Sequence, residues 1–385
     1  MNVLNIIATV DPRSGGPIEG LRLSAEKMGD WGHRSEIVSL DDPSARFLGE
    51  VGLPVHACGG HGRRGFPFQL TDRIRRDARR FDVAVIHGLW NWASLGGWLA
   101  LRQAGLPYVQ IVHGMMDPWF GHAYPAKHLA KQVVWTLAQG RALRDARAVL
   151  FTTEEERRLA SGAFRGYRYC EEVVRYGIAE PPPPSHAQRA AFQAAVPRLK
   201  SRPYLLFLSR IHEKKGCDLL TEAFARIAGH APDLQLVLAG PDQSGLGPRL
   251  QAQADRLGVG SRLHWTGMLQ GDAKWGAFRG ADAFILPSHQ ENFGIAVAEA
   301  LACAVPVLIT DKVNIWPQVK ASGGGLVEVD TVDGVSRLLD RWLQLQGDQK
   351  QGMRVAARRC YEEHFQIDAA AQSLLNVLHR AVGRG

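Results

Sequence analysis

The sequence lacks the features that mark a secreted, disulfide-linked or zinc-binding protein. Its five cysteines are scattered, odd in number and never spaced as C-x-x-C, at positions 58, 170, 217, 303 and 360. Such a set indicates neither a disulfide framework nor a zinc site and favours the cytosol. The N-terminus, MNVLNIIATVDPRSGG, has no basic n-region and no small-residue cleavage site. We therefore predict a first strand there and not a signal peptide.

Long apolar runs are missing as well. The longest weakly polar run, Gly294 to Ile309, contains Glu299 and Pro306, so it does not predict a membrane span. The net charge is +8, yet no nucleic-acid motif accompanies it, and we expect no nucleic-acid partner. A hydrophobic content of 45% with 22% charged residues is typical of a globular protein. A length of 385 residues favours two domains over one.

Positive charge is concentrated in one stretch, HGRRGFPFQLTDRIRRDARR, which holds seven arginines against two aspartates. A basic helix face of this kind can contact anionic lipid or an acidic substrate. A merely solvated face is the alternative. The region Arg63–Arg80 is therefore our candidate for contact with an anionic membrane surface.

Short apolar runs alternate with helical patterns along the first half of the chain. A helix is predicted at Pro17–Gly32, and an apolar segment around Ser94–Gln103 separates two of the strands. Strands are predicted at Asn2–Val10, 34–40, Asp82–Gly88, Pro107–Gly114, Ala146–Thr153 and Glu171–Ile178. This alternation predicts a parallel sheet that is covered on both faces.

The pattern restarts after four consecutive prolines, Pro181–Pro184, which cannot lie inside a helix or a central strand. We predict a stiff linker over 181–200. Strands follow at Pro203–Arg210, 233–240, 262–268, 283–288 and 305–310. The predicted fold class is therefore α/β, with two doubly wound Rossmann-like domains, 1–180 and 201–365, facing across a cleft. The helical segment 366–385 is predicted to pack back on the N-terminal domain.

Ligands bind such sheets at the carboxyl ends of the strands. In the first domain, Gly15 and Gly16 open a helix, where bare backbone permits close approach of a phosphate or sugar; a purely structural turn is the alternative. His113 ends a strand and precedes a glycine, which suits a catalytic histidine as well as a satisfied structural one. Asp117, Trp90 and Trp119 are candidates for an acceptor pocket, with core packing as the alternative for the aromatics.

In the second domain, Arg210 and Lys215 lie between a strand and the next helix, within SRIHEKKG. Together with a helix N-terminus they can neutralise a diphosphate without a metal, and a solvated basic loop is the alternative. The stretch HQENFGIAVAEALA places Glu291 in a loop and Glu299 about two turns into a helix. Carboxylates accept hydrogen bonds from sugar hydroxyls. Backbone N–H groups where that helix begins can hold an anion, and we place its start at Asn292, Phe293, Gly294 and Ile295.

These pieces together resemble the GT-B glycosyltransferases, most closely the retaining family 4. The matching elements are the Gly-Gly loop, SRIHEKKG, LVLAGP, HWTGMLQ, GADAFILPS and ENFGIAVAE, and they run in family order over nearly the whole chain. The combination of E-x7-E with the upstream Arg and Lys is the most specific of them. The resemblance implies a nucleoside-diphosphate-sugar donor, no metal or other cofactor, and front-face attack with retention.

The resemblance also implies a role for each matching residue. Arg210 and Lys215 would bind the diphosphate and stabilise its departure, Glu299 would hold the ribose, and Glu291 would contact the donor sugar. The backbone of Asn292–Ile295 would surround the phosphate and sugar. Three further matches concern the rest of the site: His113 near the transferred sugar, Gly16 in the loop that approaches donor and acceptor, and Thr266–Leu269, with Met268, at the base.

The expected function is therefore a cytoplasmic, retaining hexosyltransferase. Its donor would be of the GDP-mannose or UDP-glucose type, and its acceptor a glycan or lipid-linked sugar in polysaccharide or lipopolysaccharide assembly, met at the inner face of the cytoplasmic membrane. A nucleotide-sugar epimerase on the same fold and a non-catalytic nucleotide-sugar-binding protein are the alternatives. Two departures from the family, Tyr176-Gly177 where many relatives have Asn-Gly and the unusual segment His113–His128, leave the acceptor open.

Overall fold

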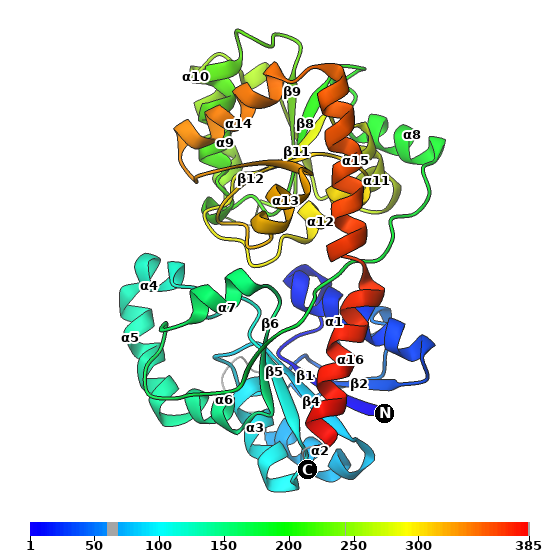
Figure 1. Ribbon diagram of the computed structural model, residues 1–385, viewed down its shortest axis with the longest axis vertical. Coiled ribbons are helices and arrows are strands. Elements are labelled where there is room, and N and C mark those ends of the chain that lie inside the picture. The colour runs from blue at the N-terminus through cyan, green and yellow to red at the C-terminus, as the bar shows by residue number, and fades with distance from the viewer. Residues whose placement is uncertain (60–67, 243, 384–385) are drawn as a thin grey trace. The chain divides into compact units, whose positions relative to one another are not determined.

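The computed structural model describes residues 1–59, 68–242 and 244–383 (Figure 1). The chain forms two compact units. Unit 1 comprises Met1–Gly177 and Ile367–Gly385, and unit 2 comprises Ile178–Gln366.

Unit 1 is built on a parallel sheet in the order β3-β2-β1-β4-β5-β6-β7. Its strands are β1 (Asn2–Ile7), β2 (Arg34–Ser39), β3 (Val55–Ala57), β4 (Val83–His87), β5 (Tyr108–Ile111), β6 (Ala148–Phe151) and β7 (Glu171–Val173). Its helices are α1 (Gly16–Asp30), α2 (Phe68–Asp77), α3 (Trp92–Ala104), α4 (Trp119–Ala123), α5 (Pro125–Val134), α6 (Gly140–Asp145), α7 (Glu154–Ala160) and α16 (Ile367–Gly383). The strand order reverses between β1 and β4.

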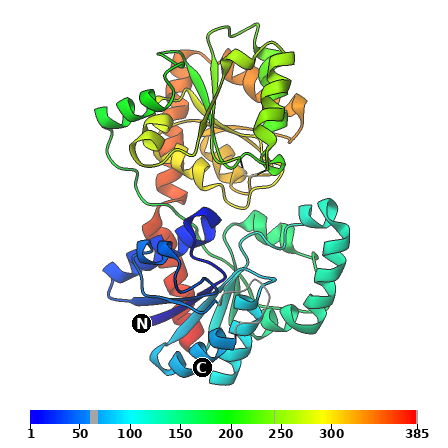
Figure 2. The ribbon, with the colours of Figure 1, turned by 180° about the vertical axis from the view of Figure 1, so that it is seen from behind.

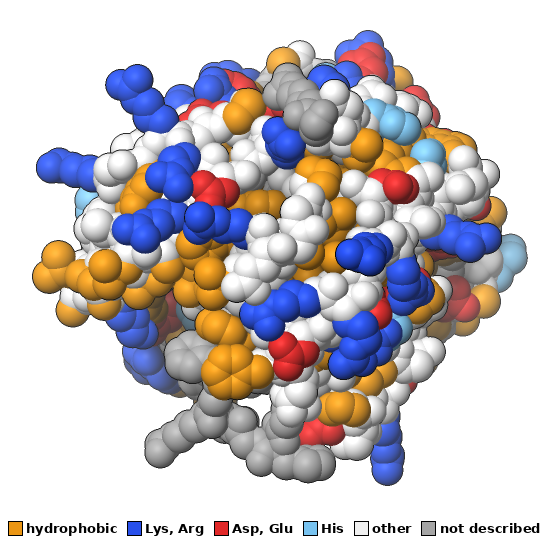
Figure 3. Space-filling model, turned by 90° about the horizontal axis from the view of Figure 1, so that it is seen from below, with side chains coloured by type: hydrophobic (Ala, Val, Ile, Leu, Met, Phe, Trp, Pro, Cys, Tyr) orange, Lys and Arg blue, Asp and Glu red, His pale blue; other side chains and the backbone are white. Residues whose placement is uncertain are grey.

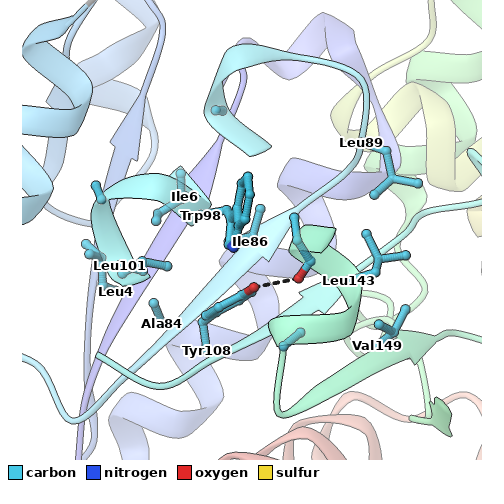
Figure 4. Packing of buried hydrophobic residues seen from close by; sticks show 14 of the residues in the cluster. Leu4, Ile6, Ala84, Ile86, Leu89, Trp98, Leu101, Tyr108, Leu143 and Val149 are labelled. Carbon is cyan, nitrogen blue, oxygen red and sulfur yellow. Dashed lines mark hydrogen bonds between the residues drawn. The ribbon is translucent and has the colours of Figure 1, made fainter. Parts of the chain in front are cut away.

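Both faces of this sheet are buried because alternate side chains of each strand enter different cores. Leu4 and Ile6 of β1 pack with Trp98 and Leu101 of α3 in one core, where the Tyr108 hydroxyl donates to the Ala142 carbonyl at 2.5 Å (Figure 4). Val3 of β1 and Val83 and Val85 of β4 face the opposite core, which helix α16 completes with residues that include Ala371, Leu375 and Leu378. Figure 2 shows α16 lying along unit 1, which confirms the predicted return of the C-terminal helix.

Unit 2 repeats the architecture with a parallel sheet in the order β10-β9-β8-β11-β12-β13. Its strands are β8 (Tyr204–Leu208), β9 (Gln235–Ala239), β10 (Leu263–Gly267), β11 (Ala283–Leu286), β12 (Val307–Thr310) and β13 (Gly325–Glu328). Its helices are α8 (His186–Ala195), α9 (Cys217–Ile227), α10 (Leu246–Arg256), α11 (Gly271–Gly280), α12 (Ile295–Ala302), α13 (Trp316–Ser322), α14 (Val332–Gln344) and α15 (Gly347–His364). In Figure 1, α9, α10 and α14 lie on one side of the sheet and α11, α12 and α15 on the other. Two doubly wound α/β units confirm the predicted fold class.

Two sequence predictions were wrong in detail. The segment 181–200 is not all linker, because α8 lies within it, capped by the Ser185 side chain. Helix α8 packs so closely on α11 that a side chain at Gly276 would meet the Gln188 carbonyl at 2.0 Å. The predicted strand Glu171–Ile178 ends at Val173. The two short strands β3 and β13 were not predicted.

No helix in the described part of the chain combines the length and the apolar character that crossing a membrane requires.

Candidate active site

The residues predicted to bind a donor gather where the strand order of unit 2 reverses. Strands β8 and β11 are neighbours, and their connections leave in opposite directions along the sheet. Arg210 and Lys215 follow β8, and Glu291 follows β11. A crevice at the carboxyl ends of such a strand pair is the usual ligand site of a doubly wound sheet.

The loop after β8 is held close to the end of β11 by a glycine. His212 begins a short turn, Glu213–Lys215, by accepting a hydrogen bond from the Lys214 N–H at 3.1 Å. Gly216 then adopts φ 65°, and a Cβ there would lie 1.9 Å from the Pro287 carbonyl oxygen. Only glycine permits both the left-handed backbone and this close approach. The final glycine of SRIHEKKG therefore holds the neighbouring Lys215 close to the end of β11.

Lys215 forms an ion pair with Glu291. The two side chains are only 9% and 20% exposed, so each charge depends on the other for compensation. Arg210 is exposed and forms no ion pair within the described residues. The cluster thus presents one free guanidinium beside a lysine that is already neutralised.

The backbone after Glu291 turns into α12 as the sequence predicted. The Glu291 N–H donates to the Lys312 carbonyl at 2.9 Å, and the Asn314 N–H donates to the Glu291 carbonyl at 3.0 Å. Gly294 adopts φ 83° and precedes Ile295, so α12 begins at the last of the four residues predicted for its start. Glu291 and the N-terminus of α12 are therefore fixed together.

Glu299 lies just over one turn into α12, and not the two turns that the sequence suggested, because the helix begins only at Ile295. Its carboxylate pairs with Lys274 of α11, whose Nζ lies 2.7 Å from Oε1. Lys274 was not predicted, because no local pattern relates a residue of α11 to one of α12. Both acids of the E-x7-E element are therefore compensated by a lysine from elsewhere in unit 2.

The segment predicted to face the nucleotide base, Thr266–Leu269, spans the end of β10 and the two residues after it. Gly267 adopts φ 65°, and the next side chain, Met268, is 56% exposed. An exposed methionine gives a flat, polarisable apolar surface that suits an aromatic base.

In unit 1, the Gly-Gly loop follows β1 and opens α1. Gly15 adopts φ 85°, and α1 begins at Gly16. The Tyr176 hydroxyl donates to the Gly16 carbonyl at 2.6 Å, and a Cβ at Gly20 would collide with the same hydroxyl. Tyr176, which departs from the family pattern, thus fixes the first turn of α1.

His113 belongs to a buried chain of polar groups that crosses the sheet of unit 1. Its Nε2 lies 3.1 Å from Nδ1 of His87, and Nε2 of His87 lies 3.1 Å from Oδ1 of Asn5. Burial lowers the pKa of His113 to about 4, and burial, aided by His113, lowers the pKa of His87 well below its usual value. Both rings are neutral at pH 7, so His87 donates one of its two hydrogen bonds and accepts the other. A cavity of about 30 Å³ adjoins the chain, room for a water molecule.

The backbone beside His113 is anchored by Glu156. His113 adopts φ 50°, and the next N–H, that of Gly114, donates to Glu156 Oε1 at 2.5 Å. The second oxygen of Glu156 accepts from the backbone and hydroxyl of Thr152. Sequence reasoning missed Glu156, although Thr153 and Glu156 have the spacing of a capping box and the Thr153 hydroxyl does cap α7.

The acceptor candidates have local partners in unit 1. Asp117 accepts a hydrogen bond from the Trp119 N–H at 2.8 Å, at the start of α4. The Trp90 ring packs on Phe164 with centroids 4.8 Å apart and joins the core cluster, which matches the core-packing alternative. Among the described residues, no group of three or more His, Cys, Asp or Glu side chains could hold a metal ion.

Comparison with known proteins identifies the family. Residues 15–177 match the model of the glycosyl transferase 4-like domain, and residues 188–359 match that of the group 1 glycosyl transferases. The chain belongs to family 4 of the GT-B glycosyltransferases. A D-inositol 3-phosphate glycosyltransferase of Xylanimonas cellulosilytica is 28% identical to this glycosyltransferase over 360 residues, which cover 86% of the chain and 82% of the relative.

Solved structures show the same fold. HepE of Anabaena, in complex with UDP and glucose, superimposes with a TM-score of 0.79 at 18% identity and covers 99% of this chain and all of its own. WaaG, a glycosyltransferase involved in lipopolysaccharide biosynthesis, gives a TM-score of 0.69 at 15% identity and covers 98% of this chain and 99% of its own. The glycosyltransferase therefore has the GT-B fold that its sequence predicted.

Proposed function

We propose that this glycosyltransferase transfers a hexose from a nucleoside-diphosphate sugar, with retention of anomeric configuration, to a glycan or lipid-linked acceptor in polysaccharide or lipopolysaccharide assembly. The observation that carries the proposal is the Lys215–Glu291 ion pair beside the exposed Arg210, at the strand reversal of unit 2. A diphosphate needs cations, a sugar needs hydrogen-bond acceptors, and this cluster offers both within one ion pair.

The related proteins support a nucleotide sugar as donor, and the donors that we propose are of the UDP-glucose or GDP-mannose type. HepE has been solved with UDP-glucose, and WaaG takes part in lipopolysaccharide biosynthesis. The name of the Xylanimonas relative points to a small phosphorylated polyol, so an inositol phosphate belongs in any panel of acceptors.

In the proposed reaction, Arg210 and Lys215 stabilise the diphosphate as its bond to the anomeric carbon breaks, and no metal takes part. The leaving diphosphate accepts the proton of the acceptor hydroxyl, which attacks from the same face. Glu291 accepts hydrogen bonds from the hydroxyls of the donor sugar, and His113 contacts the transferred sugar as a neutral imidazole. Glu299 accepts from the ribose hydroxyls, with Lys274 orienting its carboxylate. The acceptor is bound by unit 1, where Asp117 and Trp119 are the candidates.

A thermal-shift series with GDP- and UDP-sugars tests the donor. A ligand present at about a hundred times its Kd stabilises a protein by about 2.7 kcal/mol, so the correct donor raises the Tm by several degrees. Glu299→Gln should weaken the shift. Glu328→Gln is the matched control, because Glu328 is also an ion-paired acid of low exposure, 19% exposed and paired with Arg337 and Arg341. It lies on the edge strand β13 and has no proposed contact with the donor, so its replacement should leave the thermal shift unchanged.

Transfer is then measured with the stabilising donor and a panel of glycan, lipid-linked and inositol phosphate acceptors, and the anomeric configuration of the product is read by NMR. An α-linked product from an α-linked donor supports the proposal. Conversion of the donor into its epimer without an acceptor supports the epimerase alternative. Donor binding with no turnover of any acceptor, and no hydrolysis of the donor, supports a non-catalytic binding protein.

A further inference from the structure

Helix α5 of unit 1 and the π-turn that continues it, Trp135–Gln139, expose a row of large aliphatic side chains. We call this row the α5 ridge: Leu129, Val133, Val134 and Leu137. They are 69%, 55%, 38% and 65% exposed, respectively. Leu129, Val133 and Leu137 recur every four residues and therefore form one stripe along the helix. Isolated exposed aliphatic residues are ordinary, but a contiguous stripe of this kind usually marks a binding surface.

The opposite face of the same helix is fixed in the core of unit 1. Helix α5 continues through a π-turn, Trp135–Gln139, in which both Trp135 and Gln139 are fully buried. His128 stacks on Phe164 with ring centroids 4.8 Å apart. Rotation of the helix cannot bury the ridge without exposing Trp135, so the ridge stays on the surface.

The charge around the ridge has one sign. The sequence contains no Asp or Glu between positions 118 and 144. Lys127, Arg141 and Arg165 are exposed and form no ion pair with any described residue. Arg165 is held beside α5 because its N–H donates to the Gln132 side chain at 3.2 Å. Figure 3 shows hydrophobic side chains flanked by Lys and Arg on the side of unit 1 where Figure 1 places α5.

The basic stretch that the sequence analysis singled out is weaker by comparison. Positions 63–67 lie outside the described residues. In the described part, Arg73 pairs with Asp77, Arg75 with Asp72 and Arg80 with Glu36. Local pairing thus neutralises much of its charge, which leaves Arg76 and Arg79 without an ion pair to any described residue.

We propose that the α5 ridge and its basic border form the surface by which this glycosyltransferase docks on an anionic lipid bilayer. The ridge would enter the boundary between headgroups and acyl chains, while Lys127, Arg141 and Arg165 contact anionic headgroups. The inference deepens the proposed function and rests on it, because a lipid-linked acceptor is the reason for the enzyme to bind a membrane.

Charge decides between a bilayer and a second copy of the chain as the occupant. In a two-fold symmetric dimer through the ridge, the basic border of one copy would face that of the other. The segment 118–144 supplies no acid to compensate it, and the first acid beyond, Asp145, is already paired with Arg144. An anionic bilayer supplies the missing negative charge together with an apolar layer. A bilayer can therefore bury the aliphatic ridge and also compensate the positive charge of its basic border.

Co-sedimentation with vesicles tests the inference on the full chain. The protein should bind vesicles of phosphatidylglycerol and phosphatidylcholine at least tenfold more tightly than phosphatidylcholine alone, and 0.5 M salt should weaken the binding. The triple variant L129Q/V133Q/L137Q should lose at least tenfold in affinity, as should K127E/R141E. Glutamine keeps helix propensity, and unchanged thermal unfolding checks the fold.

Two matched variants serve as controls. Val355→Gln removes a valine that is 62% exposed on α15 of unit 2, and R76E/R79E removes the unpaired charges of the other basic stretch; both should bind vesicles like wild type. Absence of vesicle binding overturns the inference. The inference is also overturned if R76E/R79E no longer binds vesicles while the triple variant still does. A ridge-dependent dimer that does not bind vesicles also overturns it. Donor-induced thermal shifts, measured without lipid, report separately on the proposed function.

Discussion

Glu291 and Glu299 stand in an apolar stretch because each is held by a lysine from another element. Lys215 reaches Glu291 from the loop after β8, and Lys274 reaches Glu299 from α11. A half-buried carboxylate without such a partner would cost several kcal/mol. Each acid keeps its charge in this way and can still accept hydrogen bonds from a ligand.

The Lys215–Glu291 pair gives the proposed mechanism a specific signature. If Lys215 serves the diphosphate and Glu291 the sugar, Glu291→Gln frees the lysine while it removes a carboxylate from the neighbourhood of the phosphates. We expect free nucleoside diphosphate to bind with equal or higher affinity, and kcat for transfer to fall by a hundredfold or more, about 2.7 kcal/mol. Lys215→Met should instead weaken diphosphate binding by tenfold or more. Calorimetry and initial rates measure both, and similar losses of binding in the two variants would contradict the assignment.

The histidine chain of unit 1 predicts a dependence of stability on pH. Because the pKa values of His113 and His87 are lowered in the folded protein, the unfolded chain binds more protons between about pH 4 and the normal histidine pKa near 6.5. The free energy of unfolding should therefore fall as the pH falls through this window, by about 1.4 kcal/mol per pH unit for each histidine.

Thermal unfolding of wild type and His87→Leu between pH 4.5 and 7.5 checks this prediction. The stability of the variant should change less with pH than that of wild type, whatever its absolute Tm. An equal dependence on pH in the two proteins would contradict the prediction. If His87 also positions His113, transfer should fall in His87→Leu and recover partly in His87→Asn, whose amide can still reach Nε2 of His113.

At the scale of elements, the sequence specified most of the fold because the buried strands and the strand-end motifs are local signals. The runs in β8 and β11 are apolar on both faces, those in β1 and β4 are mostly so, and Gly216 and Gly294 occur where the backbone must be left-handed. Strand β3 escaped prediction because it is a short, half-exposed strand at the edge of the sheet. Helix α8 escaped it because the prolines before Ser185 dominated the local pattern.

Residues of the candidate site could be predicted where they belong to one sequence motif. They could not be predicted where packing brings separate elements together. Arg210, Lys215, Glu291 and the start of α12 follow from motifs. Lys274, Tyr176 and Glu156 do not follow from motifs, because each meets its partner from another element: α11 beside α12, the segment after β7 beside α1, and α7 beside the loop after β5. The sequence identified His113 but could not show the Asn5–His87 chain behind it, since those contacts cross three strands.

At the scale of the whole molecule, the last helix belongs to the first unit. Helix α16 follows unit 2 in the chain, yet Ala371, Leu375 and Leu378 complete a core to which the strands of unit 1 contribute most of the other residues. Stability of unit 1 therefore depends on residues that are separated from the rest of it in the chain by the whole of unit 2, Ile178–Gln366. The proposed contacts to the diphosphate and the ribose of the donor, in contrast, all come from residues of unit 2.

This division predicts that the two properties separate on mutation. Leu378 is fully buried, and Leu378→Ala should destabilise unit 1 by about 2–5 kcal/mol through the cavity that it leaves. Affinity for the free nucleoside diphosphate, whose proposed contacts lie in unit 2, should stay within a factor of two, because no residue of unit 2 belongs to that core. Calorimetric unfolding with and without the diphosphate measures both: the variant should lower the transition of unit 1, and the diphosphate should still raise that of unit 2. A matched loss of diphosphate affinity in Leu378→Ala would show instead that the diphosphate site depends on unit 1.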